Sequence, residues 1–217
     1  MEKQVAEIRQ TIVSMGGLVE KALAIIAEVL RNRNKDFLAQ VQELEEQINQ
    51  LHLDVDALCM KAIATQSPVA RDLRFTLAVI KMNADIERMG DQCISISYTL
   101  EEYKKEQPLV EMKSIREMLT EVQKMVRMAL DCFTQNRNDL ANDVLLYDDR
   151  VDNLRNQINS AMIDKMKMDP SFIPAALDLI FMARNLERIA DHCTNIAEDV
   201  IFVNTGRDVR HGGSHEQ

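Results

Sequence analysis

The sequence is poor both in residues that interrupt helices and in residues that favour strands. Among 217 residues there are six Gly, four Pro and no Trp, and only 4% are aromatic. Strands are enriched in aromatic and β-branched residues, and all-β folds need frequent turns. This composition argues against many short strands and predicts long helices. The hydrophobic fraction of 46% is ordinary for a globular protein.

Basic residues are also in deficit, because 26 Lys and Arg face 35 Asp and Glu, for a net charge of −9. A nucleic-acid-binding protein would normally carry a basic stripe, so we expect no nucleic-acid partner. The most apolar early segment, "ALAIIAEVL" at 22–30, contains Glu28 and is too short to span a bilayer. No signal-peptide core follows the polar N-terminus. We therefore expect a cytoplasmic protein with no membrane insertion.

The four cysteines form no CxxC pair. Reduced thiols buried in the core are the expected state of such isolated cysteines.

Apolar residues recur at helical spacing along most of the chain and predict six helices. Their expected ranges are 5–31, 37–65, 68–103, 110–134, 140–166 and 174–204. Ser67 is expected to cap the third helix, with Pro68 in its first turn, and Gly206 is expected to end the sixth.

The chain also contains an internal repeat. "ERMGDQC" at 87–93 matches "ERIADHC" at 187–193, and "LEEQINQL" at 44–51 matches "YDDRVDNL" at 147–154. Each half reads as helix, helix, Pro-containing turn, helix. The prediction is an all-α fold of two tandem three-helix bundles, at 1–106 and 107–206, with the boundary near Pro108 and a disordered tail at 207–217.

Paired carboxylates recur within this repeat. Glu87 and Asp91 lie one helical turn apart, as do Glu187 and Asp191, and like charges at that spacing repel by about 0.2–0.5 kcal/mol. The partner helices add Asp148 and Asp152 in the second half and Glu45 in the first, where Asn49 replaces a second acid.

Carboxylates that converge in one cleft are costly without a cation. Their oxygens suit hard or borderline ions, namely magnesium, manganese, iron, calcium or zinc. The alternative is a solvated acidic surface or a partner contact. Of the two clusters, the second is the fuller candidate. His192 lies off the acidic stripe, on a stripe with Arg184 and Arg188, and is not expected to be a ligand.

Arg71 and Arg74 in "RDLR" allow two interpretations. They could pair with Asp72 and nearby acids, or they could contribute to a docking surface, where Arg is enriched.

Two longer motifs resemble a known family. "SPVARDLR" at 67–74, followed by "DIERMGD" at 85–91, is similar to the first repeat of the PhoU family, and "IPAALDLIFMARNLERIADHCTNIAEDVIFVNTG" at 173–206 is similar to the second. The resemblance covers nearly the whole chain. It implies two three-helix bundles related by pseudo-twofold symmetry.

The resemblance further implies metal clusters, of iron or zinc in some members. The matching positions are Glu45, Glu87, Asp91, Asp148, Asp152, Glu187 and Asp191. It also implies a non-enzymatic cytoplasmic regulator, often a homodimer, that represses the phosphate-starvation response. Such a regulator would link the ATPase of the phosphate ABC transporter to a sensor histidine kinase.

Two rival functions remain open. A di-metal carboxylate oxidase of the ferritin-like kind needs Glu-x-x-His pairs on two helices. Here His192 lies five residues after Glu187, and Gln92 stands at the equivalent place in the first half. A metal-free helical scaffold is the second rival. No catalytic triad order or phosphate-binding glycine loop is evident, so we expect no enzyme.

Overall fold

The computed structural model describes residues 2–31, 37–106 and 112–209. The six long helices in them are α1 (Glu2–Arg31), α2 (Phe37–Gln66), α3 (Ala70–Glu106), α4 (Lys113–Gln135), α5 (Asn138–Met168) and α6 (Ile173–Thr205). A short 3₁₀ turn, Pro170–Phe172, precedes α6. The prediction of six long helices in two three-helix bundles is confirmed. The predicted break at 32–36, the boundary near Pro108 and the tail beyond residue 209 lie outside the described residues.

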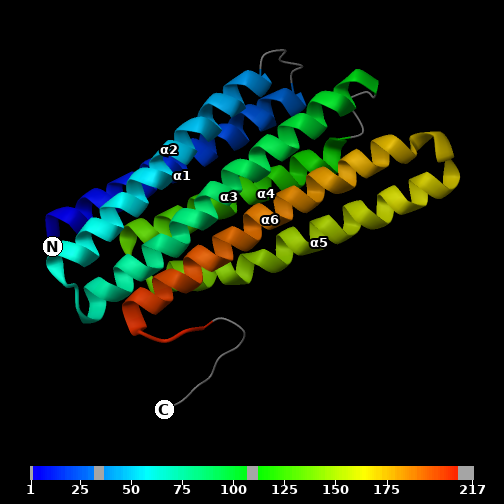
Figure 1. Ribbon diagram of the computed structural model, residues 1–217. Coiled ribbons are helices and arrows are strands. Elements are labelled where there is room, and N and C mark those ends of the chain that lie inside the picture. Colours follow the sequence, from blue (N-terminus) through cyan, green and yellow to red (C-terminus); the bar gives the residue numbers. More distant parts are fainter. Residues whose placement is uncertain (1, 32–36, 107–111, 210–217) are drawn as a thin grey trace.

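The helices run along one long axis (Figure 1). α2, α3, α6 and α5 are neighbours in that order, while α1 packs behind α2 and α3, and α4 packs behind α5 and α6. The two halves meet through α3 with α6 and through α1 with α4. Within the described ranges, no helix combines the length and apolarity that a membrane crossing requires.

Most helix ends fall within a few residues of their predicted positions, and Gly206 ends α6 as expected. Gly206 has φ +75°, and its N–H donates to the carbonyl of Phe202 at 2.8 Å. Here a left-handed residue is required, which glycine adopts without strain.

The prediction that Ser67 caps α3 is wrong. Ser67 has φ +44°, Pro68 and Val69 are not helical, and α3 begins only at Ala70. The chain must reverse direction between α2 and α3 within three residues, and this tight turn takes Ser67 out of the extended conformation that an N-cap normally has. Arg74, also near this turn, donates from Nε to the carbonyl of Val203 at 3.4 Å and so ties the start of α3 to the end of α6.

The predicted apolar stripes form the core. α3 contributes Met82, Ile86, Met89, Cys93 and Ile96, and α6 contributes Met182, Leu186, Ile189, Cys193, Ile196 and Val200, all buried. The four cysteines are free and buried, as predicted. Burial raises the pKa of the Cys93 thiol to about 12, which keeps it protonated and unreactive.

Two adjacent glycines in α1 differ in their surroundings. A Cβ on Gly16 would clash with the methyl carbons of Leu130 on α4, whereas a Cβ on Gly17 would meet nothing within 4 Å. The close approach of α1 and α4 therefore depends on Gly16 and not on Gly17.

We predict that Gly17→Ala stabilises the protein by about 0.5–1 kcal/mol, the usual gain from replacing a helical glycine. Gly16→Ala should fall short of that gain by about 1 kcal/mol or more, because Leu130 must move. Urea unfolding of both variants measures the difference. Equal stabilisation by the two substitutions would contradict close packing at Gly16.

Candidate metal centre

The four acidic residues of the second half face one another across α5 and α6. Burial, with a further contribution from the charges of Asp152, Asp191, Asp149 and Glu187, raises the pKa of Asp148 to about 6. Burial also raises the pKa of Glu187, and the charge of Asp191 adds to that rise. The pKa of Asp191 is raised in the same way, by burial and by the charge of Asp152. The carboxylates that were predicted from helical spacing are thus close enough to repel one another.

A cation from the protein itself already contacts this cluster. Nη2 of Arg155 donates to Glu187 Oε1 at 3.1 Å and lies 3.4 Å from Asp152 Oδ1. Nε of Arg155 is buried and has no hydrogen-bond partner within the described part of the chain. One guanidinium therefore offsets part of the charge of four carboxylates.

A smaller cluster lies between α2 and α3. Burial raises the pKa of Glu87, and Asp91 raises it further, whereas His52 and Arg88 lower it and Glu45 raises it slightly. Nδ2 of Asn49, which stands where the second half has an acid, donates to Glu45 Oε1. Asn49 therefore gives one carboxylate oxygen of Glu45 a hydrogen bond, but it neutralises none of the negative charge.

Sequence reasoning missed the basic residue of each cluster. When "LEEQINQL" is aligned with "YDDRVDNL", the next residues in the two halves are His52 and Arg155. Both lie one turn or less beyond the acidic positions and face Glu87 and Glu187 respectively. The signal was present in the repeat alignment, three residues beyond Asn49 and Asp152.

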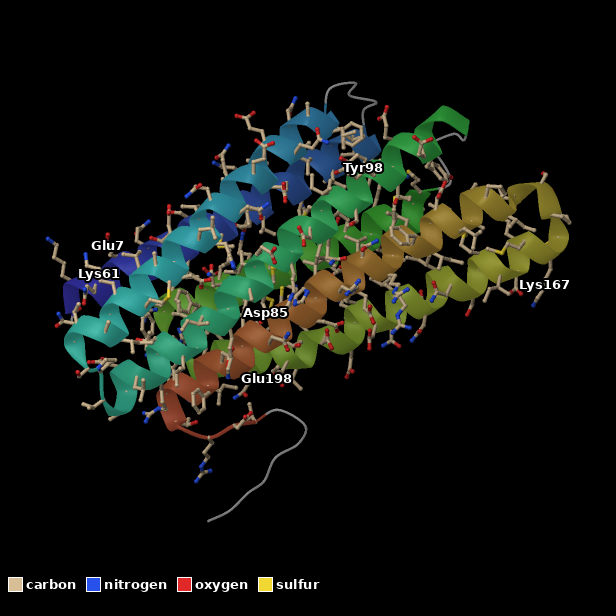
Figure 2. All side chains as sticks on the ribbon, viewed as in Figure 1. Glu7, Lys61, Asp85, Tyr98, Lys167 and Glu198 are labelled. Carbon is tan, nitrogen blue, oxygen red and sulfur yellow. The ribbon has the colours of Figure 1, made fainter. Side chains whose placement is uncertain are left out.

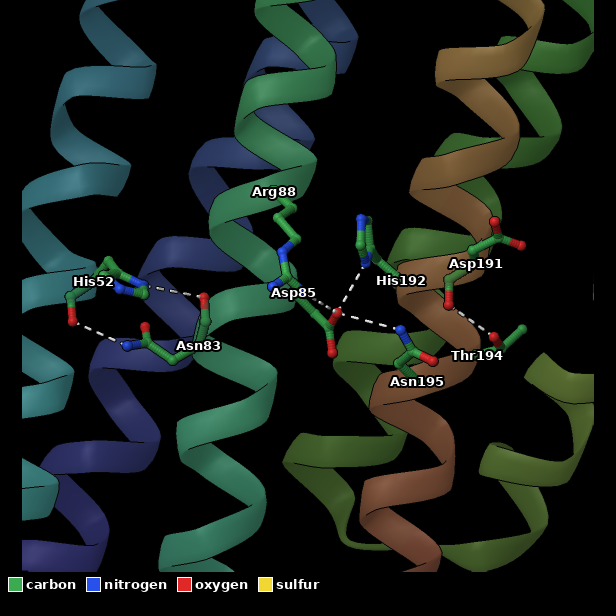
Figure 3. A network of polar contacts seen from close by, with 8 residues as sticks. All are labelled: His52, Asn83, Asp85, Arg88, Asp191, His192, Thr194 and Asn195. Atoms are coloured by element: carbon green, nitrogen blue, oxygen red, sulfur yellow. Dashed lines mark hydrogen bonds and ion pairs between the residues drawn. The ribbon is translucent and has the colours of Figure 1, made fainter. Parts of the chain in front are cut away.

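A third polar group joins the two halves of the molecule. Asp85 on α3 is only 5% exposed, and its Oδ1 lies 2.8 Å from Nδ1 of His192 on α6 (Figure 3). Nδ2 of Asn195 donates to the same oxygen at 3.2 Å, and Arg88 lies 3.7 Å away. His192 points toward α3, while Asp191 points to the other side of α6. Asp85 lies about midway along the bundle (Figure 2).

The acidic clusters supply only oxygen ligands, which fit a hard cation. In the described residues, however, no three His, Cys, Asp or Glu side chains are already arranged as ligands of one ion. Metal binding in the second half would require rotation of the carboxylates and displacement of Arg155. The residues thus fit the ligand type of such an ion, and metal binding itself stays a prediction.

The raised pKa of Asp148 gives a pH-dependent prediction for the metal-free protein. A carboxyl whose pKa is higher in the folded state than in the unfolded state favours folding at low pH, and that contribution is lost as pH rises from about 4 through 6. Asp148→Asn should therefore stabilise the metal-free protein at pH 7.5 and have little effect at pH 4.

Urea unfolding across this pH range measures the effect, with Asp143→Asn, at an exposed position of the same helix, as the matched control. A gain in stability that is the same at both pH values, or equal in the control, would contradict the repulsion at Asp148.

Comparison with known proteins assigns the family. The model of the PhoU domain matches residues 12–100 and 115–200. The phosphate-specific transport system accessory protein PhoU homolog of Pseudomonas aeruginosa is 36% identical over 214 residues, covering 97% of this chain and 87% of the relative. The PhoU accessory protein of Escherichia coli is 32% identical over 215 residues, covering 98% and 88%.

Solved structures agree with the sequence relatives. The crystal structure of PhoU from Pseudomonas aeruginosa superposes with a TM-score of 0.88 at 33% identity, covering 95% of this chain and 99% of that one. The phosphate transport system regulatory protein PhoU from Streptococcus pneumoniae, at 24% identity and a TM-score of 0.88, shares the fold. The protein belongs to the PhoU family.

Proposed function

We propose that this protein is a non-enzymatic accessory regulator of phosphate uptake. The observation that carries the proposal is the similarity over nearly the whole chain to relatives named as accessory proteins of phosphate-specific transport. These names describe accessory and regulatory proteins and not enzymes. The ferritin-like oxidase is disfavoured further because His192 contacts Asp85 on α3 and points away from Asp191.

In its finer form, the proposal is a cytoplasmic adaptor that acts as a homodimer. It would contact the ATPase of the phosphate ABC transporter and a sensor histidine kinase, and it would repress the phosphate-starvation response when phosphate is plentiful. The pairing of two similar three-helix halves supports an adaptor, since each half can present its own surface.

We further propose that the acidic clusters bind iron, zinc, manganese or magnesium. The cluster of Asp148, Asp152, Glu187 and Asp191 is the stronger candidate, because burial together with the charges of the neighbouring acids raises the pKa of Asp148 to about 6. A bound cation would relieve this repulsion and would replace Arg155 between α5 and α6. The competing interpretation, a metal-free scaffold, leaves Arg155 as the permanent counter-ion.

The regulatory role predicts that deletion of the gene derepresses a phosphate-starvation reporter in high phosphate. The expected result is reporter activity close to that of starved wild-type cells, restored to the repressed level by a plasmid copy. An unchanged reporter together with unchanged phosphate uptake would overturn the regulatory proposal.

The metal proposal predicts that the second half holds more metal than the first. Elemental analysis of purified protein should show that Glu187→Ala/Asp191→Ala loses most of the bound metal, whereas Glu87→Ala/Asp91→Ala loses less. Both double variants remove two carboxylates at equivalent repeat positions, so each is the control for the other. Equal losses would contradict the asymmetry, and metal-free wild-type protein would contradict metal binding.

A further inference from the structure

A pocket of about 430 Å³ lies between α3 and α6, where residues 91–95 of α3 face residues 181–188 of α6. Its polar lining comprises Asp91, Gln92 and Ser95 from α3 and Arg184, Asn185 and Arg188 from α6. The repeat places this pocket and the Asp85 network at equivalent positions, because α3 and α6 are the corresponding helices of the two halves.

The chemistry of the two equivalent positions differs. The Asp85 network has the buried acid Asp85 where the pocket has Asn185. It has His192 where the pocket has Gln92. Arg88 lies 3.7 Å from Asp85, but its equivalent, Arg188, has a neutral amide three residues before it. The acid that neutralises one side is therefore missing from the other.

The pocket carries two arginines that form no direct ion pair with another described residue. Arg184 stands where the first half has Ala84, one helical turn before Arg188. Among the described residues, neither guanidinium takes part in a hydrogen bond or an ion pair within 4.0 Å. They act only at longer range, where they partly oppose the burial that raises the pKa of Glu187 and of Asp191. Two unpaired guanidinium groups one turn apart suit an oxyanion, which Arg binds through paired N–H donors.

Gln92 supplies a further polar group that can bind a ligand in the pocket. Its side chain is 8% exposed and lines the pocket, yet it makes no hydrogen bond to another described residue. Its amide atoms are not among the fully enclosed polar atoms that lack a partner, so they are open to whatever fills the pocket. A polar ligand in the pocket would supply the missing partner.

Asp91 decides which oxyanion fits. Its carboxylate lines the same pocket and can only accept a hydrogen bond when ionised. Hydrogen phosphate carries a hydroxyl that can donate to this carboxylate. Sulfate carries none at neutral pH, and a phosphate monoester is largely the fully ionised dianion there. Asp91 therefore disfavours sulfate and phosphate monoesters, and it can accept a hydrogen bond from hydrogen phosphate.

We propose that the pocket between α3 and α6 binds inorganic hydrogen phosphate, held by Arg184, Arg188 and Gln92 and selected by Asp91. This site is separate from the acidic cluster of α5 and α6, shares only Asp91 with the smaller cluster of α2 and α3, and needs no bound metal. Free phosphate and a phosphoryl group on another molecule share most of this chemistry, and the acceptor Asp91 favours the free ion.

Isothermal titration calorimetry tests the proposal on full-length protein freed of metal by a chelating resin, at pH 7.5 and constant ionic strength in chloride. Inorganic phosphate should bind saturably, and sulfate and phosphoserine more weakly. Arg188→Gln should weaken phosphate binding about tenfold or more, since it removes a charge-assisted hydrogen bond. Asn185→Asp should have a similar effect, because it would place an acid beside Arg188, as Asp85 lies beside Arg88 in the first half.

Arg88→Gln is the matched control, since it removes the same charge at the equivalent repeat position, and its affinity for phosphate should stay within about twofold of wild type. Asp91→Asn should abolish the preference for phosphate over sulfate. Circular dichroism melting confirms that each variant is folded.

The proposal is overturned if phosphate gives no saturable heat, or if sulfate binds as tightly as phosphate to the wild-type protein. It is also overturned if Arg88→Gln weakens binding as much as Arg188→Gln. None of these outcomes depends on metal content or on the starvation reporter, so the regulatory proposal stands or fails separately.

Discussion

The contact between α3 and α6 is the constraint on which the other features depend. A carboxylate as buried as Asp85 is costly unless donors satisfy it, and both His192 and Asn195 reach it from α6. These donors are available only when the two helices lie in one register. Because α2 packs on α3 and α5 packs on α6, that register also positions both acidic clusters relative to each other.

The two clusters handle the same repulsion with different resident cations. Arg155 is charged at every physiological pH, whereas the imidazole of His52 is charged only when protonated. The second cluster thus combines more acids with a permanent counter-ion, Arg155. The first combines fewer acids with His52, which is a counter-ion only when it is protonated. The asymmetry first visible as Asn49 in place of an acid therefore extends to the basic residues.

Periodicity within helices explains what could be predicted from the sequence. Apolar stripes such as Met82, Ile86 and Met89 identify the core, and one-turn spacing identifies the acidic pairs, because both depend only on the geometry of a single helix. The contacts of Asp85 with His192 and of Arg155 with Glu187 depend on the register between helices, which the spacing within one helix does not encode. The prediction of an N-cap at Ser67 was wrong for a related reason. The tightness of the turn between α2 and α3 depends on how the two helices pack, which the local sequence does not determine.

Repeat symmetry makes these differences informative. If the two halves were identical, each side of the axis between α3 and α6 would carry the same polar group. One side instead keeps a buried acid with its donors, which joins the halves, while the other replaces the acid with Asn185 and the histidine with Gln92. Without that acid, Arg188 forms no direct ion pair with another described residue, and it lines a pocket between α3 and α6. The same pair of helices can therefore stabilise the molecule at one position and remain free to bind an anion at the equivalent one.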